Sequence, residues 1–123
     1  MLKGGCLCKE VTFTVVASDA ATACHCSQCR KQSGHYWASG VGKEAGFDIQ
    51  GTVRWFDATS TAKRGFCPAC GSFLFWKHHN EDTMSFSLGA IDGPTGLSLK
   101  KHIFCADKGD YYEIADDVPQ KAD

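Results

Sequence analysis

The chain has 123 residues, of which 43% are hydrophobic and 22% are charged, and its formal net charge at pH 7 is −1. This length suits one domain, and the near-neutral charge argues against a general nucleic-acid-binding protein, which needs a basic surface. No stretch of about 18 apolar residues could span a membrane, and no apolar signal segment follows the N-terminus. We therefore expect a cytoplasmic protein with no membrane and no nucleic-acid partner.

Short stretches of β-branched and aromatic residues, separated by polar or Gly-containing turns, recur along the chain. They predict strands over residues 10–17, 20–26, 36–41, 47–50, 53–56, 73–78, 83–88 and 101–105. The strands 73–78 and 83–88 are close enough in sequence to form a hairpin across a polar turn. This pattern, with almost no helical periodicity, indicates a mostly β fold.

The chain shows no internal repeat and no low-complexity segment, so we predict a single small domain over residues 1–115. The polar end of the chain, residues 116–123, is predicted to be a frayed tail. Cys105 has apolar neighbours and is predicted to be a buried strand residue.

Eight cysteines are the most informative feature of the composition. Disulfides are rare in a reducing compartment, where Cys-x-Cys and Cys-x-x-Cys spacings favour metal binding or redox chemistry. Seven of the cysteines fall into three such groups. We therefore expect two zinc ions per chain.

Two of the three groups together supply four cysteines, enough to fill every coordination position of a zinc ion. Cys6 and Cys8 lie two residues apart, so in extended backbone both sulfurs face one side. Cys67 and Cys70 form a tight Cys-Pro-x-Cys-Gly turn. Four thiolates are the ligand count of a structural zinc site, which would join two distant parts of the chain.

The third group contains three cysteines within six residues: Cys24, Cys26 and Cys29. Cys24 and Cys26 share one side of the predicted strand, and polar residues 27–33 predict a helical turn that brings Cys29 back toward them. Three protein ligands are typical of a catalytic zinc, which keeps its fourth position for water or substrate. The alternative is a second structural zinc whose fourth ligand is one of these residues: His35, His78, His79, His102 or Cys105.

These motifs resemble the glutathione-dependent formaldehyde-activating enzyme family, which also includes centromere protein V. The resemblance is carried by residues 5–8, 24–30 with 33–34, 64–72 and 102–104. It implies a zinc-held β-tent of short antiparallel strands. It also implies a structural zinc on the four-cysteine set and a catalytic zinc, with access for glutathione, on the three-cysteine set.

The expected function is that of a zinc-dependent carbon–sulfur lyase or synthase acting on a glutathione-type thiol adduct. An example is the formation of S-hydroxymethylglutathione from glutathione and formaldehyde, so the expected partners are a small thiol and an aldehyde. The alternative is a non-catalytic zinc module that binds a protein partner. Since sheet edges in such folds often pair, a homodimer is also possible.

Glutathione is anionic, so its binding site needs cations near the second zinc. The candidates are Arg30, Lys31, Lys63 and Arg64, which flank zinc ligands in the sequence. The alternative for each is an ordinary solvated surface charge. His35 is a candidate for relaying a proton to the hydroxymethyl oxygen, against the alternative of a surface or packing role.

Overall fold

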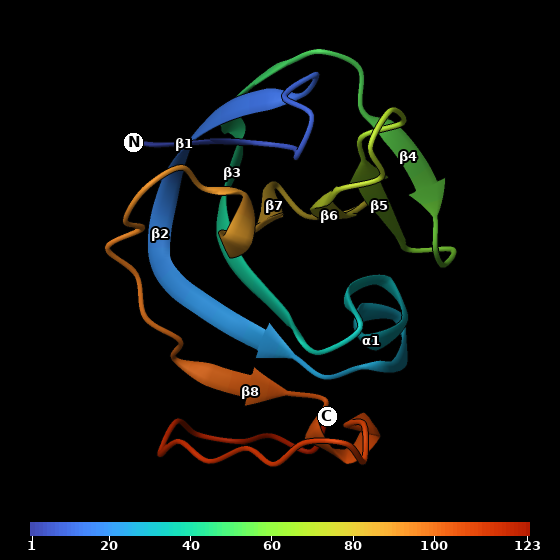
Figure 1. Ribbon diagram of the computed structural model, residues 1–123, viewed down its shortest axis with the longest axis vertical. Coiled ribbons are helices and arrows are strands. Elements are labelled where there is room, and N and C mark those ends of the chain that lie inside the picture. Colours follow the sequence, from blue (N-terminus) through green and yellow to red (C-terminus); the bar gives the residue numbers. More distant parts are fainter.

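Two long curved strands, β2 and β3, are the longest elements of the computed structural model, which describes all 123 residues (Figure 1). The strands lie in one sheet in the order β1-β2-β3-β7-β6-β5-β4, with antiparallel neighbours, and β8 pairs in parallel with β2. The mostly β prediction is confirmed. The strands are β1 (Leu2–Gly5), β2 (Thr12–Cys24), β3 (Trp37–Gln50), β4 (Arg54–Asp57), β5 (Ala62–Phe66), β6 (Phe73–His78), β7 (Thr83–Ser87) and β8 (Lys101–Ile103).

The strands β2 and β3 are each longer than the sequence predicts. Residues 10–17 and 20–26 were predicted as separate strands, and so were 36–41 and 47–50. Polar residues that interrupt the alternation of apolar side chains face solvent, and the pairing of β2 with β3 continues across them. The register of this pairing shifts between Val15 and Ala21. Such irregularities bend a strand, so one long hairpin replaces four short strands.

Two strands, β1 and β5, are absent from the prediction because their sequences contain glycines. Gly4 in β1 lies so close to the backbone of Ala90 that a Cβ atom would be 2.4 Å from its carbonyl oxygen. The glycine is therefore needed for close packing rather than for a turn.

The predicted hairpin is confirmed, since β6 pairs with β7 through Phe75 opposite Phe86.

The buried side chains form two separate groups. The larger group contains Phe13, Phe75 and Phe86, and it includes the sulfurs of Cys6 and Cys67. The smaller group contains Cys24, Cys29 and Trp37, and Phe73, Trp76 and Ile103 pack against it. Two of the four cysteines of the first set therefore lie in the main core, whereas the three-cysteine set has its own small core.

The C-terminal segment, predicted as a frayed tail, makes backbone hydrogen bonds to β8. Pro119 O accepts from His102 N at 2.8 Å, and Lys121 N donates to His102 O at 2.9 Å. The segment, red in Figure 1, thus lies along β8 as a further edge. Polar composition does not report backbone pairing of this kind.

The strand prediction over 101–105 is too long, because β8 ends at Ile103. Phe104 has a φ of 55° in the left-handed region, and Cys105 begins a 3₁₀ turn, Cys105–Asp107. Cys105 is partly exposed rather than buried.

No helix of the structure is both long and apolar enough to cross a membrane.

Candidate functional site

The four-cysteine set forms one compact cluster of sulfur atoms. Cys6 and Cys8 follow β1, and Cys67 and Cys70 follow β5. All four Sγ atoms lie within 4.8 Å of one another, with 3.6 Å between Cys6 and Cys8 and 3.7 Å between Cys8 and Cys67. Sulfurs about 2.3 Å from a tetrahedral zinc are separated by about 3.8 Å, so this cluster fits a zinc ion.

Hydrogen bonds hold this cluster in shape. The amide of Gly71, whose φ is 79°, donates to Cys67 O at 2.8 Å and closes the turn. Val11 N donates to Cys6 Sγ at 3.3 Å. Ser72 Oγ lies 3.2 Å from Cys70 Sγ, and its hydrogen bond lowers the pKa of Cys70 to about 5. These donors favour the thiolate form, which is the form that binds a metal.

The three-cysteine set lies where β2 meets the only α-helix. Cys24 ends β2, Cys26 caps α1 (Ser27–Ser33), and Cys29 is inside the helix. Cys26 Sγ accepts from Cys29 N at 3.4 Å, and Gly34 ends the helix with a φ of 80°, as predicted. The three Sγ atoms lie within 4.8 Å of one another.

The thiols of this set influence one another strongly. Hydrogen bonds from Cys24 and Cys29 lower the pKa of Cys26 and thus favour its thiolate. The hydrogen bond with Cys26 raises the pKa of Cys24. Three soft sulfur donors at this separation fit a zinc ion as three of its four ligands.

No fourth protein ligand completes the three-cysteine set. None of the five alternatives considered from the sequence joins the cluster. His102 is hydrogen-bonded to His25 at 2.8 Å, and the ring of His78 accepts from Asn80 N at 3.1 Å. His35 and His79 are exposed. The cluster of Cys24, Cys26 and Cys29 therefore offers three protein ligands to a metal.

A cavity of about 530 Å³ opens at the three sulfurs. Its walls combine aromatic and aliphatic side chains with several hydroxyl groups and three charged residues. The lining residues are Thr22, Cys24, Cys26, Ser27, Gln28, Cys29, Trp37, Ser39, Thr59, Thr61, Ala62, Arg64, Trp76, Ser85, Lys101, Ile103, Phe104 and Asp107.

Arg64 is the one predicted cation that reaches this cavity, and it is only 4% exposed. Its Nη1 and Nη2 atoms lie 3.7 and 3.6 Å from Cys29 Sγ. Its Nε donates to Gln28 Oε1 at 3.2 Å, and its Nη1 donates to Gln32 Oε1 at 2.7 Å. The guanidinium thus faces the thiol cluster and has its hydrogen bonds satisfied inside the protein.

The other predicted binding residues do not line the cavity. The Lys63 ammonium lies 4.4 Å from the centre of a Trp55 ring, and Lys31 is exposed on α1. Arg30 is half-buried, and the ring of His35 packs 4.2 Å from that of Tyr112.

Two charged residues that the sequence analysis passed over, Lys101 and Asp107, line the cavity instead. Lys101 is opposite Thr22 in the parallel pairing of β8 with β2. Only a prediction of that long-range pairing could have found it. Neither side chain makes a hydrogen bond or an ion pair within the chain, so both charges are available to a ligand.

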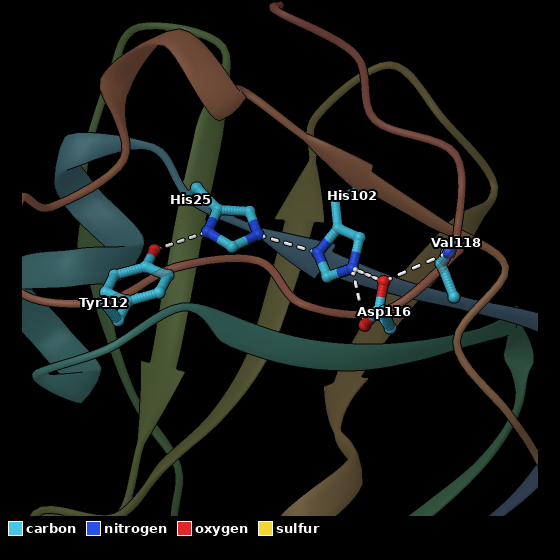
Figure 2. A network of polar contacts seen from close by, with 5 residues as sticks. All are labelled: His25, His102, Tyr112, Asp116 and Val118. Carbon is cyan, nitrogen blue, oxygen red and sulfur yellow. Dashed lines mark hydrogen bonds and ion pairs between the residues drawn. The ribbon is translucent and has the colours of Figure 1, made fainter.

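His25 faces away from the cavity, as strand parity predicts. The ring is fully buried, and its two nitrogen atoms are hydrogen-bonded to His102 and to Tyr112 (Figure 2). Burial lowers the pKa of His25 to about 4, so the imidazole is neutral at pH 7.

Comparison with known proteins places this geometry in a family. The chain is 25% identical to an uncharacterised lyase of Schizosaccharomyces pombe over 116 residues, which cover 92% of this chain and 85% of that protein. The crystal structure of a Rhodobacter sphaeroides protein has the same fold, with a TM-score of 0.66 at 21% identity, over 77% of this chain and 92% of that one. The model of the glutathione-dependent formaldehyde-activating enzyme family matches residues 1–107. The chain belongs to the glutathione-dependent formaldehyde-activating enzyme family.

Proposed function

We propose that the protein is a zinc-dependent carbon–sulfur lyase or synthase that acts on a glutathione-type thiol adduct. The observation that carries this proposal is a set of three thiols, with no fourth protein ligand, facing a cavity of about 530 Å³. The family assignment and the lyase description of the yeast relative support the same reaction class.

The proposed roles divide between the two cysteine sets. Cys6, Cys8, Cys67 and Cys70 would hold a structural zinc, and Cys24, Cys26 and Cys29 would hold the catalytic one. A zinc ion with an open position supplies acidity, because a thiol that coordinates zinc is deprotonated. Three thiolates and a divalent ion leave one net negative charge, which the Arg64 guanidinium compensates.

The proposed reaction adds a thiol across the carbonyl group of an aldehyde. For glutathione and formaldehyde, a sulfur–carbon bond forms, the carbon–oxygen π bond breaks, and the thiol proton ends on the oxygen as S-hydroxymethylglutathione is made. The reverse sequence is the lyase reaction. The cavity volume lies within the usual range of about 300–1,000 Å³ for small-molecule sites.

Charges at the cavity suit a zwitterionic peptide. We assign Lys101 to a substrate carboxylate and Asp107 to a substrate ammonium group, since both line the cavity without a partner in the chain. Arg64 is engaged by Cys29 and two glutamines, so its role is at the metal rather than at the carboxylate.

The test is carbon-13 exchange spectroscopy of glutathione with labelled formaldehyde, with catalytic amounts of zinc-loaded protein. We expect faster exchange into S-hydroxymethylglutathione, lost in Cys29→Ser and retained in Cys105→Ser, whose thiol belongs to neither cluster. Protein with two zinc ions per chain that fails to accelerate exchange would contradict the proposed reaction.

A further inference from the structure

Four side chains form a continuous hydrogen-bonded row, shown in Figure 2: Tyr112, His25, His102 and Asp116. Tyr112 is hydrogen-bonded to His25 Nδ1, and His25 Nε2 lies 2.8 Å from His102 Nδ1. His102 Nε2 lies 3.0 and 3.1 Å from the two carboxylate oxygens of Asp116. His25 and His102 are 0% and 2% exposed, so the middle of the row is shielded from water.

The donors and acceptors of this row determine its direction. A carboxylate only accepts, so His102 Nε2–H donates to Asp116. With both imidazoles neutral, each ring has one donor and one acceptor, and His102 Nδ1 accepts from His25 Nε2–H. His25 Nδ1 is then left to accept from the Tyr112 hydroxyl. Every ring nitrogen is satisfied in this arrangement, with both histidines as the Nε2–H tautomer.

The two ends of the row are themselves fixed. Val118 N donates to Asp116 Oδ1 at 3.1 Å, which orients the carboxylate. The Lys108 ammonium donates to Tyr112 O at 2.6 Å and lies 4.8 Å from the centre of the Tyr112 ring. Both end residues are therefore held by contacts of their own, although the Asp116 side chain is 46% exposed.

The row is coupled to the thiol cluster through one residue. His25 lies between Cys24 and Cys26 in the sequence, and its amide donates to Ile103 O in β8 at 3.0 Å. A shift of the His25 backbone therefore moves the backbone that carries both neighbouring cysteines. None of the four side chains lines the cavity, so none contacts a substrate there.

The outer residues of the row lie in the C-terminal segment. The family model matches residues 1–107, so Tyr112 and Asp116 are both beyond that match. The segment also pairs with the backbone of His102 through Pro119 and Lys121. The polar C-terminal segment thus contacts His102, which is hydrogen-bonded to His25 beside the candidate metal ligands.

We propose that the C-terminal segment positions the three-cysteine site through the hydrogen-bonded row Tyr112–His25–His102–Asp116. In this role Asp116 and Tyr112 are positioning residues: they hold His25, and His25 holds Cys24 and Cys26 at the spacing that a metal requires. The inference rests on the proposed metal site at Cys24, Cys26 and Cys29.

The test compares Asp116→Ala with Asp117→Ala in the full-length chain, using cobalt(II) as the probe and chelator competition to measure affinity at each cluster. Asp117 is an adjacent carboxylate that makes no side-chain hydrogen bond, so it is a matched control. We expect Asp116→Ala to weaken cobalt binding at the three-cysteine set roughly tenfold, as loss of outer hydrogen bonds does at metal sites. Binding at the four-cysteine set is expected to stay unchanged, which also reports an intact fold.

Two further variants probe the same row. Asp116→Asn keeps a carbonyl acceptor for His102 and is expected to recover part of the lost affinity. Tyr112→Phe removes the donor at the other end and is expected to weaken the same site alone. Equal cobalt affinity in wild type, Asp116→Ala and Tyr112→Phe would overturn the proposal.

Nitrogen-15 NMR of the histidine rings supplies a readout that does not need the metal. In wild type we expect the Nε2–H tautomer for both His25 and His102, and a mixture of tautomers in Asp116→Ala. The Nδ1–H tautomer in the wild-type protein would overturn the directed row. Wild-type protein that binds cobalt only at the four-cysteine set would instead contradict the proposed function, so the two failures are distinguishable.

Discussion

At the scale of single residues, the position of Arg64 in the sequence suggests substrate binding, but its contacts in the fold are with the thiol cluster. An arginine beside zinc ligands is a natural partner for a substrate carboxylate. In the fold it is buried, with Nη1 and Nη2 near Cys29 Sγ. Nη1 also donates to Gln32, and Nε donates to Gln28. A buried guanidinium needs a compensating negative charge, which metal-bound thiolates of the proposed site would provide.

Replacing Arg64 is therefore expected to weaken the metal site before it weakens substrate binding. Arg64→Met keeps most of the side-chain volume but removes the charge and its hydrogen bonds, which are worth about 1.5–3 kcal/mol when a charge is involved. We expect roughly tenfold or greater loss of zinc affinity at the three-cysteine set, measured by chelator competition. Lys63→Met is the control, and equal losses in both variants would contradict the assigned role.

Tyr112 provides a prediction in alkaline solution. Burial raises the pKa of Tyr112 above its ordinary value of 10.0. The unfolded chain then releases the phenol proton at a lower pH than the folded chain, so stability falls as pH rises through about 10. We expect the 295 nm absorbance titration to contain one late-ionising tyrosine that Tyr112→Phe removes. Loss of an early-ionising tyrosine in that variant would contradict the burial argument.

At the scale of elements, the sequence predicted correctly those features that depend on residues close together in the chain. The alternation of cysteines, the short helix ending at Gly34 and the 73–88 hairpin depend on neighbouring residues and were predicted correctly. The continuity of β2 and β3 and the parallel pairing of β8 depend on distant partners. For the same reason Lys101 could not be recognised at the site from its own neighbourhood.

The pairing of β8 leads to a prediction about substrate binding. Lys101 lines the cavity, whereas Lys100, one residue earlier, does not. We expect Lys101→Ala to raise KM for glutathione about threefold to tenfold with little change in kcat, because a carboxylate contact is lost. Lys100→Ala is the control. A change in kcat alone would place Lys101 in the chemistry rather than in binding.

At the scale of the whole molecule, the two cysteine clusters lie in different parts of the fold. Loss of a ligand from one cluster should therefore affect stability differently from loss of a ligand from the other. Cys67 is 0% exposed in the main core and joins segments some sixty residues apart, as its 3.7 Å approach to Cys8 shows. A structural zinc contributes about 10–16 kcal/mol, which matches or exceeds the usual stability of about 5–15 kcal/mol for a domain.

Removing a ligand from each cluster therefore has different consequences. We expect Cys67→Ser to abolish cooperative thermal unfolding, whereas Cys26→Ser loses the second metal and keeps a cooperative transition. Circular dichroism and metal analysis of both variants check this. Global unfolding of Cys26→Ser would contradict the separation into a structural and a catalytic site.

The whole-molecule features that the sequence left unpredicted lie mainly at the C-terminus. Cysteine spacing and count indicated two clusters and the cysteines that form each, because ligand types and counts can be read directly from the sequence. The pairing of residues 119–122 with β8 and with the turn after it needs the assembled fold, as does the buried contact between His25 and His102. The composition of residues 116–123 gave no sign of either.

The central claim is that the three-cysteine site keeps one coordination position open for a thiol. The most direct test is the absorption spectrum of the cobalt-substituted protein, with both clusters loaded, before and after addition of glutathione. We predict changed ligand-field bands and stronger sulfur-to-cobalt charge transfer, as expected when a fourth thiolate joins three. A spectrum that does not change at saturating glutathione would contradict an open site.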